Sequence, residues 1–405
     1  MKINKMSEKD KQKDADEVAE KIVLAIDCDR SSNAMSSLAC LNTRVLVEDV
    51  ENCKCEERIA AAQIVHVLEG WLNFSSALQS FVNNEISQAQ HLAYYGELRA
   101  VLSLIAWGGT DLKGKTYRYF ASTGALEKLK FIPTHQLAWS FWQKWIATDV
   151  ARDLIFENIK LTEDRSLNDV SELLSSFLPV DERSIRNWGF DLMTNAINDR
   201  DQRNHSSYGI QLASKEVSYS ENDIKKFVTN VWDLLFPVTT SIWQFDMAMV
   251  KYVIKSVEKT LCVTDSKEPL SDELESIHYR VLKSLSISDE RLIKYLESNA
   301  DLEIFEFATK DEYDVKNMLS RSLIFLRIAT LALKRSIIRQ ENVLGWIDSW
   351  LRRTIAINFP EDLELNYLID GYQEAYNQFL DNSSNLNQYT MLMRPTACLA
   401  WGLTQ

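Results

Sequence analysis

Residues 85–107 read EISQAQHLAYYGELRAVLSLIAW and are followed by Gly108 and Gly109. Apolar side chains recur in this segment at helical spacing, at positions 86, 92, 95, 98, 102 and 105. A glycine pair directly after such a pattern is typical of a helix C-terminus. The segment therefore predicts one long amphipathic helix. Apolar residues at helical spacing also occur in most other parts of the chain.

Helical periodicity continues on both sides of this segment. The chain of 405 residues contains only 11 Gly and 6 Pro, fewer than sheets joined by tight turns consume. We therefore predict an all-α, multi-helix bundle, with a short β insert near 110–133, where Tyr117–Phe120 is the candidate strand. The remaining helices are expected near 15–25, 56–82, 139–145, 166–177, 181–204, 221–235, 240–261, 271–285, 288–297, 311–338, 341–357 and 361–380.

The length predicts two domains of unequal size. Residues 1–15 are expected to form a mobile charged tail. A first helical domain is predicted over 16–262, and a second over 271–405. The segment 263–270, which contains Thr264, Pro269 and several charged residues, is the predicted linker.

Composition excludes several classes of protein. No window reaches about 18 consecutive apolar residues, so no membrane contact is expected. The first ten residues are charged and lack the apolar core of a signal peptide, which favours a cytoplasmic protein. The six cysteines are scattered, and Cys53 and Cys55 are too close for the usual zinc hairpin, so neither a metal nor a cofactor is predicted. The net charge of −13 argues against extensive coating of nucleic acid but permits a small basic site.

The segment 195–209, NAINDRDQRNHSSYG, gathers the residues that could carry chemistry. It ends a predicted helix whose earlier turns are apolar. On an unbroken helix, residues five apart lie about 140° apart around the axis, so Arg200 and His205 converge only if the helix ends or bends between them. Ser206, Ser207 and Gly209 are suited to such an end.

This arrangement resembles the HEPN superfamily, helical-bundle ribonucleases that need no metal, together with their inactive relatives. The family motif is an arginine, often followed by a polar residue, and a histidine after four to six intervening positions. Arg200, Asp201 and His205 fit it. The resemblance implies an endoribonuclease, of the kind found in toxins and antiviral-defence effectors, with His205 as general acid or base and Arg200 as phosphate clamp. It implies RNA-binding contacts from Asp201, Arg203, Asn204 and Tyr208.

The resemblance also implies partners. Family members bring two motifs together, and this chain contains one match, so a homodimer is expected. A regulatory or antitoxin protein is a further partner that the resemblance allows. A second register aligns Arg203-Asn204 with the start of the motif and puts Tyr208 in place of the histidine. That alignment describes a degenerate, non-catalytic site, and a plain helix cap is the third alternative, so enzymatic activity stays open at this point.

Two other sets of residues invite a functional interpretation. Glu97 and Arg99 lie mid-helix beside an apolar face, where local pairing is favoured over a phosphate-binding role. Lys316, Ser320, Arg327 and Lys334 fall close to one side of an apolar helix. They could line an RNA groove, although cations extending from a partly exposed face are the favoured interpretation.

Overall fold

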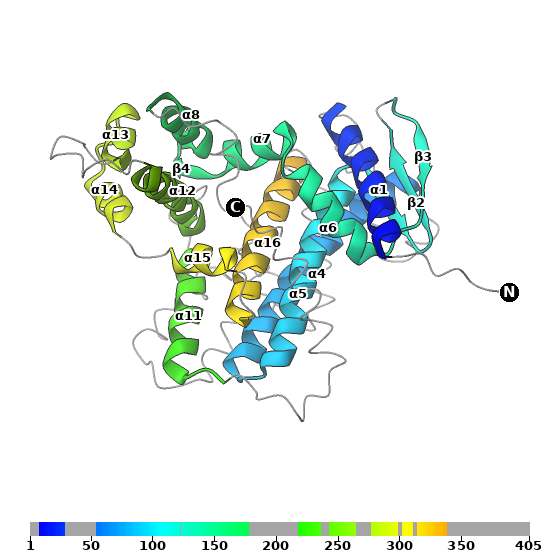
Figure 1. The fold of residues 1–405 in the computed structure, drawn as a ribbon, viewed down its shortest axis with the longest axis horizontal. Coiled ribbons are helices and arrows are strands. Elements are labelled where there is room, and N and C mark those ends of the chain that lie inside the picture. Colours follow the sequence, from blue (N-terminus) through cyan, green and yellow to red (C-terminus); the bar gives the residue numbers. More distant parts are fainter. Residues whose placement is uncertain are drawn as a thin grey trace, which may run out of the picture. The chain divides into compact units, whose positions relative to one another are not determined.

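The fold of the described residues is all-α, as predicted. The computed structural model contains twelve helices and five short strands in this part of the chain (Figure 1). None of these helices is both long and apolar enough to cross a membrane. The structure describes residues 8–28, 54–121, 123–177, 218–235, 243–264, 277–298, 302–310 and 314–337.

Contacts divide the chain into two compact units, which we describe separately. The described part of unit 1 covers residues up to Val150 and the part of α16 (Val315–Ile337) from Ser322 onward. The described part of unit 2 lies within 151–177 and 219–321. Most of the predicted linker, 265–270, lies outside the described residues, and the division into 16–262 and 271–405 stays a prediction.

Unit 1 is organised around an antiparallel helix pair. Helix α4 (Cys55–Val82) and helix α5 (Ile86–Trp107) lie side by side and are joined by a three-residue turn (Figure 1). The turn is tight because Asn84 takes a left-handed backbone conformation, with φ 62°, which asparagine tolerates better than most residues. Burial of the apolar faces of both helices supplies most of their stability, because isolated helices are only marginally stable in water.

The later half of α16 completes this core. The indole Nε1 of Trp71 on α4 donates a hydrogen bond of 3.0 Å to the hydroxyl of Thr330. Two glycines let the three helices approach closely. A Cβ atom at Gly70 would lie 2.6 Å from Leu326 Cδ2, and one at Gly96 would lie 2.3 Å from Ser322 Oγ. A side chain at either position would force its neighbour to shift, so glycine is favoured at these two contacts by packing rather than by backbone conformation.

A small antiparallel sheet follows α5. Strands β1 (Thr110–Lys113), β2 (Thr116–Phe120) and β3 (Leu126–Leu129) pair in the order β1-β2-β3, which confirms the β insert predicted near 110–133. The turns contain Gly114 and Gly124, both with positive φ. The Tyr117 hydroxyl donates to the Ile132 carbonyl and ties the sheet to the segment before α6 (Thr134–Trp145).

Helix α1 (Glu8–Cys28) packs along α6 and is longer than the helix predicted over 15–25 (Figure 1). Its early residues take part in this packing. The Gln12 amide donates to the Ser140 hydroxyl at 2.9 Å, and Asp14 forms an ion pair with Lys130. Residues 8–15 thus belong to α1, although their charge made them look like part of a tail.

Unit 2 consists of short helices around α12 (Gln244–Thr264). Residues 246–257 of α12 include many buried apolar side chains, and this helix contacts β4 (Lys160–Thr162), α8 (Leu167–Phe177), α11 (Glu221–Leu234) and α13 (Ile277–Ser284). The elements of this unit are α7 (Asp149–Asn158, apart from its first two residues), β4 (Lys160–Thr162), β5 (Arg165–Ser166), α8 (Leu167–Phe177), α11 (Glu221–Leu234), α12 (Gln244–Thr264), α13 (Ile277–Ser284), α14 (Glu290–Glu297), α15 (Glu303–Thr309) and the start of α16.

Candidate functional site

The predicted catalytic cluster lies outside the described residues, which stop at Phe177 and resume at Ser218. Its geometry therefore contributes nothing to the assignment of roles. The residues concerned are Arg200, Asp201, Arg203, Asn204, His205 and Tyr208.

Arg99 joins α4 to α5 through two polar contacts. Its Nη1 donates to Nδ1 of His66 at 3.0 Å, and its Nη2 lies 3.0 Å from a carboxylate oxygen of Glu69. Because arginine can only donate, the His66 nitrogen must accept, and the ring is neutral. Burial and the neighbouring guanidinium lower the pKa of His66 to about 3. Glu97 is fully buried. The local pairing expected for Arg99 is thus what the structure contains.

The polar stripe on α16 does not form a groove. Ser320 is completely buried and Arg327 is only 4% exposed. A nucleic-acid strand could not reach these two members, so the RNA-groove hypothesis for the stripe is wrong, and so is the idea that the whole stripe lies on a partly exposed face. The sequence pattern predicted an exposed polar face, but both the polar and the apolar side chains along most of this helix are buried. Lys316, by contrast, is partly exposed.

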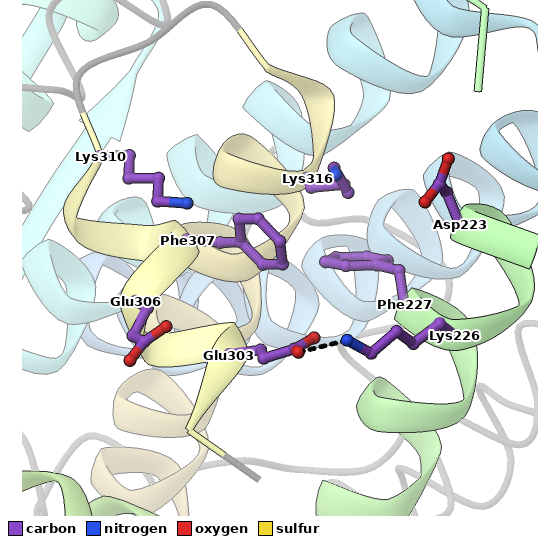
Figure 2. A pocket seen from close by; sticks show the side chains of 8 residues that line it. All are labelled: Asp223, Lys226, Phe227, Glu303, Glu306, Phe307, Lys310 and Lys316. Carbon is purple, nitrogen blue, oxygen red and sulfur yellow. Dashed lines mark hydrogen bonds and ion pairs between the residues drawn. The ribbon is translucent and has the colours of Figure 1, made fainter. Parts of the chain in front are cut away.

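Lys316 lines a pocket within unit 2 that combines charged and aromatic side chains (Figure 2). The pocket lies between α11 and α15, beside the start of α16, and has a volume of about 230 Å³. The Phe227 and Phe307 rings meet edge to face inside it, with centroids 5.8 Å apart. Its lining has three carboxylates, three lysines and the two rings, from Asp223, Lys226, Phe227, Glu303, Glu306, Phe307, Lys310 and Lys316.

Two of the lysines, Lys310 and Lys316, lie close to the ring of Phe307. The Nζ atoms of Lys310 and Lys316 each lie 4.7 Å from the centroid of Phe307. Lys316 Nζ also lies 5.2 Å from the centroid of Tyr219. Aromatic faces attract ammonium groups at this range. In Figure 2 both lysines lie above Phe307, whereas Glu303 and Glu306 lie below it.

Hydrogen bonds fix the backbone that carries these lysines. The buried Arg321 donates from Nη1 to the carbonyls of Ala308 and Lys310, at 3.2 and 3.1 Å, and so holds the end of α15. Oδ1 of Asp314 accepts from the Lys316 amide and from the Tyr219 hydroxyl, both at 2.8 Å. Burial and the Asp314 carboxylate raise the pKa of Tyr219, so its phenol stays protonated and keeps donating.

The carboxylates of the pocket differ in how far they are already engaged. Glu303 accepts from Lys226 with one oxygen and from Asn230, at 2.9 Å, with the other. Asp223 is exposed and stays ionised, because hydrogen bonds from Ser220, and then the charges of Lys316 and Lys226, lower its pKa. Glu306 is exposed on α15. The pocket can thus offer cations, an aromatic surface and carboxylate acceptors to one ligand.

No metal site is found in the part of the chain that the structure describes, where no three His, Cys, Asp or Glu side chains gather around a common point. Cys55 donates from its thiol to Oδ2 of Asp111 at 3.4 Å. Burial, followed by the charge of Asp111, raises the pKa of this thiol to about 11. Cys55 is therefore protonated at neutral pH and is neither a nucleophile nor a ready metal ligand.

No protein-family model matches this chain, and the comparisons with curated proteins and with solved structures found no match either. The functional assignment therefore rests on the residues alone. Sequence reasoning missed the α11–α15 pocket because its members come from three separated segments. Of these members, only Lys316 stands out in the sequence, and no motif connects it with Phe227 or Phe307.

Proposed function

We propose that this chain is a metal-independent endoribonuclease of the HEPN kind. One observation carries the proposal: Arg200 and His205 occur at the family's spacing, with polar Asp201 after the arginine, at the predicted end of a helix. The all-α fold supports it, because the resemblance requires a helical protein.

The chemistry of RNA makes these two residue types sufficient in principle. RNA carries its own nucleophile, the 2′-hydroxyl, so cleavage needs a base near neutral pKa and a cation on the phosphate. Histidine, with an unperturbed pKa of about 6.5, suits the first role. Arginine is permanently charged and presents a fork of donors to phosphate oxygens, which suits the second. His205 then moves the proton and Arg200 stabilises the charge that develops on the phosphate.

A second candidate function is a non-catalytic helical protein that binds RNA or a protein partner through a degenerate site. The observation that favours it is the alternative register, in which Arg203-Asn204 begins the motif and Tyr208 stands where the histidine is required. Tyrosine has an ordinary pKa of about 10 and is a poor base at neutral pH, so this register predicts binding without cleavage.

Incubating the purified protein with RNA in the presence of EDTA tests the proposal. Cleavage that EDTA does not inhibit supports a catalytic HEPN-like site. Binding without any cleavage, with or without added divalent metal, supports the second candidate.

A further inference from the structure

The α11–α15 pocket of unit 2 brings two lysine ammonium groups to one aromatic ring. Two ammonium groups, of Lys310 and Lys316, lie at the same distance from one ring centroid, and therefore within twice that distance of each other. Like charges held this close repel each other, and an anion between them relieves the repulsion. A phosphate that accepts hydrogen bonds of about 2.8 Å from both groups spans roughly 8 Å between them, so binding one would hold the two flexible lysine side chains within that distance of each other.

Lys316 has capacity for such a contact. Its nearest carboxylate oxygen, Asp314 Oδ2, lies 3.7 Å from Nζ, which is longer than a hydrogen bond. Asp314 is instead occupied through its other oxygen, where it accepts from the Tyr219 hydroxyl and from the Lys316 amide. The fold therefore uses this acid to hold the lysine backbone and leaves the ammonium group able to bind a further acceptor.

The remaining lining selects among phosphate-bearing ligands. The three carboxylates balance the three lysines, so a bare phosphate would also meet repulsion from Asp223 and Glu306. A nucleotide can form hydrogen bonds with both the lysines and the carboxylates of the pocket. Its phosphate accepts from lysine, while its ribose hydroxyls and base amino groups donate to carboxylates. Phe307 is half-buried and borders both lysines, so the apolar part of a nucleotide held by them can contact the exposed part of this ring.

The size of the pocket favours part of a strand over a free cofactor. Its volume of about 230 Å³ lies below the range of about 300–1,000 Å³ that is usual for pockets that enclose a small molecule. We propose that the α11–α15 pocket binds one nucleotide of an RNA strand, with the phosphate between Lys310 and Lys316 and the base or ribose against Phe307, Asp223 and Glu306. This inference rests on the proposed function in taking RNA as the partner.

The test is the equilibrium binding of a labelled single-stranded oligoribonucleotide to the full chain, measured by fluorescence anisotropy in the presence of EDTA. A His205→Ala background prevents cleavage during the measurement. Replacing both Lys310 and Lys316 by alanine should weaken binding at least about tenfold. The slope of log affinity against log salt should become shallower by about 0.7 for each phosphate that the protein no longer neutralises.

Matched variants separate the pocket from general charge and from folding. Lys294→Ala on α14 removes an exposed lysine outside the pocket and should change affinity less than about twofold, within the range of screened surface charges. Lys316→Arg keeps the charge and should retain binding. Phe307→Leu keeps apolar volume but removes the ring, and should weaken binding without changing the salt slope. Each variant must melt like the background protein.

Three results overturn the inference: RNA affinity unchanged in the double variant, an equal loss in Lys294→Ala, or a pocket that binds AMP at submillimolar concentration while RNA binding is insensitive to Lys310 and Lys316. The last result would assign the pocket to a free nucleotide. The proposed function fails separately, because loss of cleavage in the His205→Ala protein is scored independently of binding at this pocket.

Discussion

His66 is held neutral by the way it contacts Arg99. The guanidinium donates to the ring, and burial lowers the pKa of His66 to about 3. In the unfolded chain this pKa returns to about 6.5. Between about pH 3 and about pH 6.5, His66 is protonated in the unfolded state but neutral in the folded state. The free energy of unfolding therefore decreases as the pH falls from about 6.5 towards 3.

Replacing His66 by glutamine should therefore flatten the acid side of the stability profile. The glutamine carbonyl can still accept from Arg99, so the contact between α4 and α5 is retained. Urea unfolding followed by circular dichroism at pH 7 and pH 4.5 measures the effect. The wild-type protein should lose more stability across this interval than the variant, and equal losses would show that His66 is not a source of acid sensitivity.

Arg203 and Tyr208 distinguish the two registers of the predicted catalytic cluster. If Arg200 and His205 are the working pair, Tyr208→Phe deletes only a hydroxyl outside the pair and should change RNA cleavage little. In the other register, Arg203→Ala and Tyr208→Phe should both weaken RNA binding while His205→Ala does little. Binding and cleavage measured on the same three variants decide between the registers, provided that each variant keeps the helicity and melting temperature of the parent.

Individual site residues show the limit of sequence reasoning at this scale. The sequence correctly suggests that Arg99 pairs locally, because an arginine beside an apolar helix face needs a partner. It cannot show that Ser320 and Arg327 are buried, because a polar residue on an apolar helix is compatible with either a packed or an exposed position. Nor can it bring Phe227 and Phe307 together, since that contact depends on how α11 packs against α15.

At the scale of elements, the contact between α5 and α16 depends on Gly96. A Cβ atom added there would meet Ser322 Oγ at 2.3 Å, while Ser322 Cβ stays at an ordinary 3.6 Å. Gly96→Ala should therefore destabilise the protein by up to about 2 kcal/mol, because an overpacking cost of about 1–3 kcal/mol is only partly offset by the gain in helix propensity of about 1 kcal/mol. Thermal and urea unfolding measure the change.

A double variant provides the control for this steric explanation. Ser322→Ala removes the clashing oxygen, whose hydroxyl finds no hydrogen-bond partner among the described residues and so should be removed at little cost. Adding Ser322→Ala to Gly96→Ala should recover most of the stability that Gly96→Ala costs. If the two effects merely add, the close approach at Gly96 does not explain the presence of glycine.

Most helices among the described residues were predicted, but α7, α15 and the β4–β5 pair were not, and the helices predicted over 181–204, 341–357 and 361–380 lie outside the described residues. The packing partners of the elements were not predicted. Helix α5 follows from its periodicity and the glycine pair at its end, and the β insert follows from its glycine-rich turns. The charged start of α1 was wrongly predicted to be part of a mobile tail. In the structure, Gln12 and Asp14 lie in the helix and contact α6 and the segment before it. The packing of α16 on α4 and α5 depends on glycines far away in the sequence, and local pattern does not encode such pairings.

At the scale of the whole molecule, the proposed site implies a dimer. HEPN-like catalysis joins two motifs, and this chain contains one match to the motif. Light scattering of the active protein at micromolar concentration should give the mass of two chains. A monomer throughout the concentration range in which the protein cleaves RNA would contradict a shared site.

The net charge of −13 sets a second condition on the whole molecule. An acidic protein binds RNA only through local basic features, because the remaining surface repels the phosphate backbone. The proposed RNA contacts, which are the arginines at 200 and 203 and the lysines of the α11–α15 pocket, would supply such features. RNA affinity should accordingly fall with rising salt, but with the shallow slope of a few phosphate contacts.

The most direct test of the central claim is the cleavage rate of labelled RNA by wild-type protein and by folded His205→Ala, side by side in EDTA, with analysis of the product ends. Wild-type protein should leave 2′,3′-cyclic phosphate ends, because the attacking group is the 2′-hydroxyl of the substrate. His205→Ala should be slower by about 10²-fold or more, since it lacks the group that moves the proton. Unchanged cleavage by folded His205→Ala would contradict the assignment.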